Sequence, residues 1–180
     1  MFAKDTPIMR IMQPGRDFVD DQLLEGENVI LFTGQEAWSD LKKFTKIIKK
    51  LQGELYIVDP YYGNATLSIL EKFGKHKKIK FLTAELGSTE QKNLQSFSNN
   101  LTRFKREFSN VEIRVINNKR ELHDRYIIAT NGIVVIGHGL KDFGIDKESF
   151  LIFLPKEISG KIIPILKNRF TSRWGKSTKI

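Results

Sequence analysis

The segment LHDRYII at residues 122–128 is followed by Asn131-Gly132 and by the run IVVIGHGLKD at residues 133–142. Two apolar runs that meet at an Asn-Gly dipeptide are typical of a β-hairpin. The pattern therefore predicts that His123 and Arg125 lie on the first strand, and that both side chains share one face because strand residues alternate. An imidazole beside a guanidinium can attack or protonate a phosphate ester while the cation binds its oxygens.

Before the hairpin, apolar strands alternate with amphipathic helices. Short apolar runs predict strands at 29–32, 55–58, 79–83 and 111–116, and another at 150–154. Spacings of three and four predict helices at 33–51, 64–73 and 88–109, and a last helix at 158–170 interrupted near Pro164. The apolar stripe of the first helix begins at Trp38. This alternation predicts an α/β fold with a mixed, mainly parallel sheet flanked by helices, to which the hairpin adds antiparallel pairing.

Length and composition favour one globular domain. The chain has 180 residues, of which 40% are hydrophobic, enough for a single well-buried core. Residues 1–27 show no regular period and contain several prolines and glycines, so we expect an irregular N-terminal arm followed by a domain at 28–180. The sequence has no cysteine, which excludes disulfides, a thiolate nucleophile and Cys-based zinc sites. No metal-nuclease motif is evident either, so we expect neither metal nor cofactor.

The charge balance favours an anionic partner. The sequence holds 30 Lys and Arg against 21 Asp and Glu, a net charge of +9, with basic clusters at 72–80 and 161–179. Nucleic acid, DNA or RNA, is the commonest partner of such a protein, although a solvated surface can give the same total. No apolar run approaches the roughly 18 residues that cross a bilayer. We therefore expect a cytoplasmic protein without membrane association.

Residues just past the predicted strands are further site candidates, because ligands of α/β sheets gather at the carboxyl ends of strands. Asp59 can orient His123 by accepting its second ring proton, or can simply form a turn before proline. Tyr61 can stack on a base or pack beneath its loop. His138, within Gly137-His138-Gly139, can enter the site or remain in a loop.

The hairpin segment resembles the phospholipase D superfamily, whose signature is His-x-Lys-x4-Asp followed by Gly-Ser-x-Asn. His123 matches the histidine, Arg125 stands in place of the lysine, and Thr130 occupies the aspartate position. Gly137 matches the motif glycine. His138 or Gly139 replaces the serine, and Leu140 or Lys141 replaces the asparagine. The resemblance covers residues 122–144 directly and implies the phospholipase D fold for most of residues 28–170.

The resemblance implies a metal-independent phosphodiesterase or nuclease in which one histidine attacks phosphorus and a second protonates the leaving group. With a single motif in the chain, it implies a homodimer in which His123 of each subunit takes one role. Arg125 and Lys141 would then bind phosphate, and Asp142 or Asp59 would orient the histidine.

Two alternatives remain open at this stage. Since the motif aspartate, serine and asparagine are all replaced, the chain can be a catalytically degenerate module that binds nucleic acid or a protein partner in a phage-defence or regulatory system. It can also be a scaffold that uses the N-terminal arm and the Phe-rich helix at 88–109, without any chemical site.

Overall fold

The computed structural model describes residues 28–32, 35, 37–86, 91–143 and 148–180. The predicted arm at 1–27 lies outside the described residues, as do the predicted starts of the helices at 33 and 88. The main sheet has the order β1-β9-β8-β7-β2-β4-β6-β10. Its strands are β1 (Val29–Phe32), β2 (Leu55–Val58), β4 (Ile79–Thr83), β6 (Val111–Val115), β7 (Tyr126–Ala129), β8 (Gly132–Ile136), β9 (Ser149–Pro155) and β10 (Thr178–Lys179).

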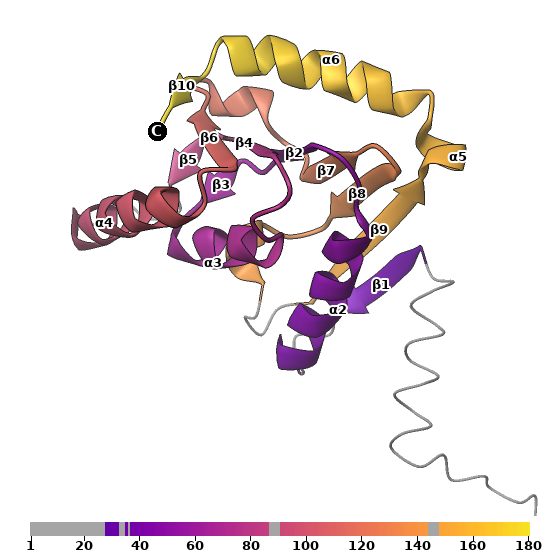
Figure 1. The fold of residues 1–180 in the computed structure, drawn as a ribbon, viewed down its shortest axis with the longest axis horizontal. Coiled ribbons are helices and arrows are strands. Elements are labelled where there is room, and N and C mark those ends of the chain that lie inside the picture. Colours follow the sequence, from indigo (N-terminus) through magenta and orange to yellow (C-terminus); the bar gives the residue numbers. More distant parts are fainter. Residues whose placement is uncertain (1–27, 33–34, 36, 87–90, 144–147) are drawn as a thin grey trace, which may run out of the picture.

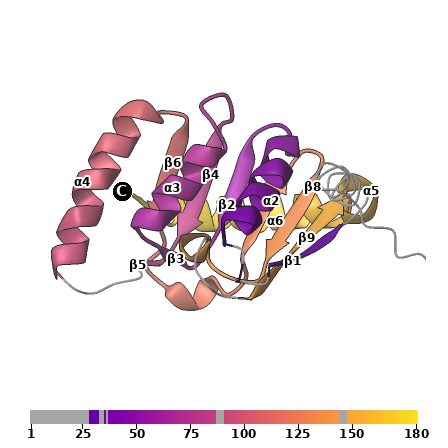
Figure 2. The same cartoon turned by 90° about the horizontal axis from the view of Figure 1, so that it is seen from below.

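Helices cover both faces of this sheet. Figures 1 and 2 show α2, α3 and α4 on one face and α6 on the other. Their bounds are α2 (Ala37–Lys50), α3 (Asn64–Lys72), α4 (Gln91–Glu107) and α6 (Ile162–Gly175), with a short α5 (Lys156–Ser159) before α6. A second, two-stranded sheet pairs β3 (Tyr61–Tyr62) with β5 (Glu85–Leu86) in parallel. Within the described residues, no helix combines the length and hydrophobicity that a membrane-spanning segment needs.

The predicted α/β class with a mixed sheet is confirmed, but the balance of pairing differs from the expectation. Among the described strands of the main sheet, parallel pairing joins β2 to β4 and β4 to β6. The hairpin strands, β9 and β1 extend it in antiparallel fashion on one side, and β10 does so on the other. The expectation of a mainly parallel sheet was therefore wrong. Apolar runs indicate where strands lie, but not the order or direction in which they pair.

Strand alternation divides the core between the two faces. Ile57 and Ile127 pack with the helices α2, α3 and α4, whereas their neighbours Val58 and Ile128 pack with Phe170 of α6. Burial on both faces explains why the central strands read as continuous apolar runs. Phe97 and Phe104 of α4, and Phe108 directly after it, are buried in the core.

Local details correct four sequence expectations. The strand β7 begins only at Tyr126, so His123 and Arg125 precede the hairpin instead of lying on it. The hairpin loop is Thr130-Asn131, one residue earlier than the Asn-Gly dipeptide, because Ala129 pairs with Gly132. Pro164 lies in the first turn of α6, where its missing N–H is tolerated, and the helix break falls before Ile162. Trp38 begins the predicted apolar stripe but is 71% exposed.

Candidate functional site

The topology brings three chain segments to one edge of the sheet. Because β7 runs antiparallel to β2 and Tyr126 pairs with Val58, the residue before β7 lies beside the residue after β2. The strand β8 returns to the same edge, since Val135 pairs with Tyr126. A short 3-10 turn, η2 (Leu140–Asp142), follows there and packs against α3. Asp59, Arg125 and the segment 137–142 therefore meet at the carboxyl ends of β2 and β4, the usual ligand edge of an α/β sheet.

Asp59 is the centre of this arrangement and is fully buried, at 0% exposure. Its Oδ1 accepts a hydrogen bond from the backbone N–H of Tyr61 at 3.0 Å, and its Oδ2 accepts one from Leu140 at 2.5 Å. The Nε of Arg125 lies 3.4 Å from Oδ1 in an ion pair. Burial raises the pKa of Asp59, while the two backbone donors and Arg125 act in the opposite direction. The carboxylate is thus held by Arg125 and two loops.

Arg125 is largely inside this network, with its side chain 23% exposed. Its guanidinium also lies over the ring of Tyr61, 5.9 Å from the centroid. Tyr61 itself is partly exposed and its backbone holds Asp59, so the predicted neighbours Asp59, Tyr61 and Arg125 do come together. The expectation that Asp59 orients His123 stays a prediction, since the contacts of its carboxylate are to Tyr61, Leu140 and Arg125.

Gly139 allows the loops to approach this closely. A Cβ atom built at this position would lie 3.0 Å from Oδ2 of Asp142, 3.4 Å from Oδ2 of Asp59 and 3.7 Å from Nε of Arg125. A side chain here, such as the serine that the motif resemblance places at 138 or 139, would require the Asp142 carboxylate to shift by a few tenths of an ångström. The glycine is explained by close packing of backbone against the charged network.

Lys141 and Asp142 form the outer part of the edge. The Nζ of Lys141 lies 2.8 Å from Oδ1 of Asp142, in a partly buried pair. Lys141 also lines a pocket of about 230 Å³ that opens beside the first turn of α3 and includes Tyr62, Asn64 and Phe97. The pocket combines an ammonium group, amide side chains and a helix N-terminus, which together suit an anion.

His138 lies on the inner side of the same loop, within an aromatic cluster. Its ring stacks with Phe32 at a centroid distance of 6.3 Å and meets Phe143 edge to face at 4.3 Å. Burial lowers its pKa, and the nearby Asp142 partly offsets this effect. The imidazole is therefore mainly neutral near pH 7, and its contacts are those of a packing side chain more than those of an anion ligand.

His123 has a different environment. It is exposed, and within the described residues no hydrogen bond, ion pair or ring contact involves its imidazole. Thr130, at the motif's aspartate position, lies beyond the other end of β7, on the order of 20 Å along the chain. There its methyl group lies 2.5 Å from the position of a Cβ built on Gly53, and the φ of 75° at Gly53 separately favours glycine. A carboxylate at 130 would therefore not reach His123.

Sequence reasoning missed the backbone of Leu140 as a ligand of Asp59 and the pocket beside Tyr62 and Asn64. The signal for the first was weak, because a backbone donor has no sequence signature. For the second, Gly63-Asn64 at the start of a predicted helix was a usable signal. Among the residues that the structure describes, no cluster of three or more His, Asp or Glu side chains is arranged to hold a metal ion.

Comparisons with known proteins give a consistent family and fold. A family model described as "Phospholipase D-like domain at C-terminus of MIT" matches residues 42–156. Among proteins of curated function, none matches the sequence significantly. The structure resembles Nuc from Salmonella typhimurium, a phospholipase D family member (TM-score 0.57, 13% identity, 84% of this chain and 97% of that one).

Two other solved structures share the fold. NucT from Helicobacter pylori matches with a TM-score of 0.56 and 10% identity over 84% of this chain and 98% of that one. TrmBL2, an archaeal chromatin protein, matches with a TM-score of 0.51 and 14% identity over 93% of this chain. The chain spans 64% of the length of TrmBL2. At these identities the likeness shows the fold, and the predicted phospholipase D fold is confirmed.

Proposed function

The chain belongs to the family of phospholipase D-like domains at the C-terminus of MIT, and from this premise we propose that it is a nucleic-acid-binding module that holds phosphate groups without cleaving them. This is the degenerate-module alternative from the sequence, now favoured over catalysis. The observation that carries it is the Asp59–Arg125 ion pair.

That ion pair changes the role of the motif cation. A guanidinium that binds a transferred phosphate must face the substrate, whereas Arg125 turns to a buried carboxylate and is mostly covered. Displacing it would leave Asp59 charged and without its cation in a buried position, which is costly. Arg125 is therefore proposed as a positioning residue that fixes the loop at 139–142, and not as a phosphate clamp.

The exposed groups at the edge supply the phosphate contact. Lys141 shares its charge with Asp142, but a partly exposed pair is weak enough for a phosphate to compete for the ammonium. The first turn of α3 adds backbone N–H groups and the positive end of the helix dipole. The net charge of +9 favours a polyanion, and TrmBL2, which has the same fold, is described for a mode of DNA binding.

A second candidate is the phosphodiesterase or nuclease reaction through His123 in a homodimer. The observation that favours it is the exposure of His123 beside this edge. Two imidazoles must then reach one phosphate across the dimer. Because the chain has no cysteine, His123→Cys carrying a nitroxide label measures their separation directly. A short distance in a stable dimer supports catalysis, and a monomer rules out this two-histidine mechanism.

Binding is tested by fluorescence anisotropy with labelled DNA and RNA oligonucleotides over a series of salt concentrations. We expect the logarithm of the binding constant to fall linearly with the logarithm of the salt concentration. Lys141→Ala should lower the magnitude of this slope by about 0.7–0.9, the value for one lost phosphate contact. Arg106→Ala, at the exposed end of α4, is the matched control and should keep the slope. No binding at low salt, or equal slopes for all three proteins, would contradict the proposal.

A further inference from the structure

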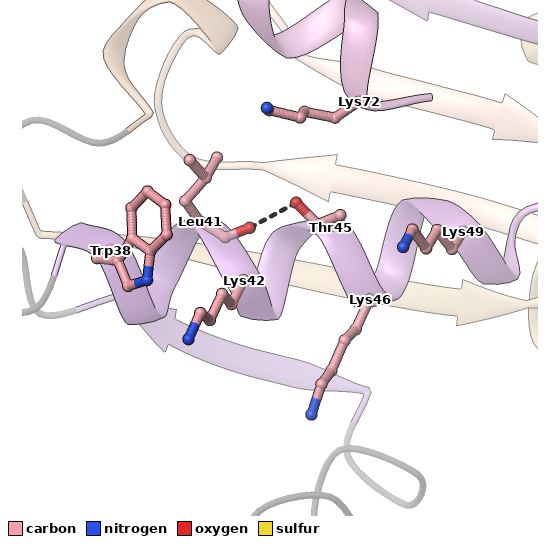
Figure 3. A pocket seen from close by; sticks show the side chains of 7 residues that line it. All are labelled: Trp38, Leu41, Lys42, Thr45, Lys46, Lys49 and Lys72. Carbon is pink, nitrogen blue, oxygen red and sulfur yellow. Dashed lines mark hydrogen bonds between the residues drawn. The ribbon is translucent and has the colours of Figure 1, made fainter. Parts of the chain in front are cut away.

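A second surface lies on the outer side of α2, where that helix meets the end of α3. A pocket of about 330 Å³ opens there, large enough for a small ligand. Figure 3 shows Lys72 extending from α3 toward the side of α2 that carries Trp38 and Leu41. None of the residues in the Asp59–Arg125 network lines this pocket. Its lining is Trp38, Leu41, Lys42, Thr45, Lys46, Lys49 and Lys72.

Trp38 is the most exposed of the large hydrophobic residues that the structure describes, at 71%. It lies in the first turn of α2, and its i+3 neighbour Leu41 forms the apolar floor beside it. The Nζ of Lys42 lies 5.8 Å from its ring centroid. Because this ammonium group lies over one face of the indole, the exposed ring combines a cation on that face with a flat surface for stacking.

The charge of the pocket has one sign. Four of its seven lining residues are lysines, and no described residue that lines it is acidic. On α2, Lys42 and Lys49 are seven residues apart, two turns along one side of the helix, which places them about 10 Å apart along the axis. Lys72 approaches from α3. Like charges held together repel each other, so a bound anion would be favoured here.

We infer that this pocket binds a short single-stranded segment of DNA or RNA, with one base stacked on Trp38 and adjacent phosphates on Lys42, Lys49 and Lys72. The distance of about 10 Å between Lys42 and Lys49 along the helix axis equals about three nucleotide steps of a stacked strand. Contact with both lysines therefore requires more than one phosphate. A duplex hides its base faces, whereas a single strand offers them to an aromatic ring. The inference rests on the proposed function, because nucleic acid is the partner in both, but it places the contact on a different surface.

Tryptophan fluorescence tests the inference, because the sequence has only two tryptophans. Trp174 packs against Phe170 and Arg114, so Trp174→Phe leaves Trp38 as the single reporter. Titrating the full chain of this variant with oligothymidylate should quench the emission in a saturable, salt-sensitive manner. A blunt duplex of equal length should quench much less. Equal quenching by duplex or by poly-glutamate would overturn the inference, because it would indicate charge attraction without base stacking.

Affinity measurements with matched variants complete the test. Trp38→Ala should weaken binding of the single strand by roughly fivefold to a hundredfold, and Trp38→Phe should retain most of it. Lys49→Glu should weaken binding more than Lys50→Glu, an adjacent exposed lysine outside the pocket. If the chain binds the strand but Trp38→Ala binds equally well, the inference fails and the proposed function stands. If no oligonucleotide binds, both fail.

Discussion

Arg125 binds the buried carboxylate of Asp59 across the junction of β2 and β7, with its Nε 3.4 Å from Oδ1. The same carboxylate accepts a hydrogen bond from the backbone N–H of Leu140, so this one side chain connects the end of a central strand, the start of the hairpin and the loop after it. In the motif resemblance, Arg125 occupies a position whose cation would bind substrate. In this chain its Nε lies in an ion pair with a buried carboxylate, which is why we propose a positioning role for it.

Removing the guanidinium should destabilise the fold. Arg125→Ala leaves the carboxyl group of Asp59 buried with backbone donors alone, so we expect the free energy of unfolding to fall by about 3 kcal/mol, the low end for a broken buried pair. Urea denaturation measures it. Lys119→Ala breaks the exposed pair with Glu85 and should cost less than about 1 kcal/mol. Equal small losses in both variants would show that Asp59 does not depend on Arg125.

A methyl group at position 139 should disturb the same network. The φ of Gly139 is −68°, which suits any residue, so the effect of Gly139→Ala is steric and comes from Asp142 and Asp59. We expect a loss of about 1–3 kcal/mol in the free energy of unfolding, typical of overpacking. Gly175, the last residue of α6, has no atom within 4 Å of a built Cβ, so Gly175→Ala should be neutral or slightly stabilising. Similar losses at the two glycines would contradict the close packing described here.

His138 should make stability depend on pH in a defined direction. Burial lowers its pKa below the ordinary value of 6.5, so the unfolded chain takes up this proton at a higher pH than the folded chain. The free energy of unfolding therefore falls as the pH drops below about 6.5, until the folded imidazole is also protonated. His138→Phe, which keeps a ring between Phe32 and Phe143, should remove this part of the decline. Chemical denaturation from pH 7.5 to 5 measures the difference, and parallel curves for the two proteins would refute it.

The fold was predictable where a local pattern determines it. The strand β2 is a continuous apolar run, β4 is interrupted only by Lys80 before Thr83 ends it, and the turn at 130–132 folds the hairpin nearly where Asn-Gly predicts it. The partners of each strand were less predictable, because pairing depends on the order in which elements pack. The edge strand β10 had no apolar signal, since Thr178 and Lys179 are both exposed and are held by backbone pairing to β6.

The site was predictable in its location but not in its contacts. Asp59 and Tyr61 follow β2, and Arg125 precedes β7, so their meeting at one edge follows from topology. Whether the carboxylate of Asp59 pairs with His123 or with Arg125 depends on where these side chains point and on the backbone N–H donor at Leu140. The sequence specifies neither. Similarly, the spacing of Trp38, Leu41 and Phe44 identified the apolar face of α2 without indicating how much of that face is covered.

The central claim is that this edge binds nucleic acid without breaking it. The most direct test incubates an end-labelled oligonucleotide with an excess of purified protein in EDTA, and resolves the products on a denaturing gel after binding has been confirmed in the same tube. We predict a bound strand of unchanged length for both the wild type and His123→Ala. Shorter products that form with the wild type and disappear with His123→Ala would contradict the claim and establish the histidine reaction instead.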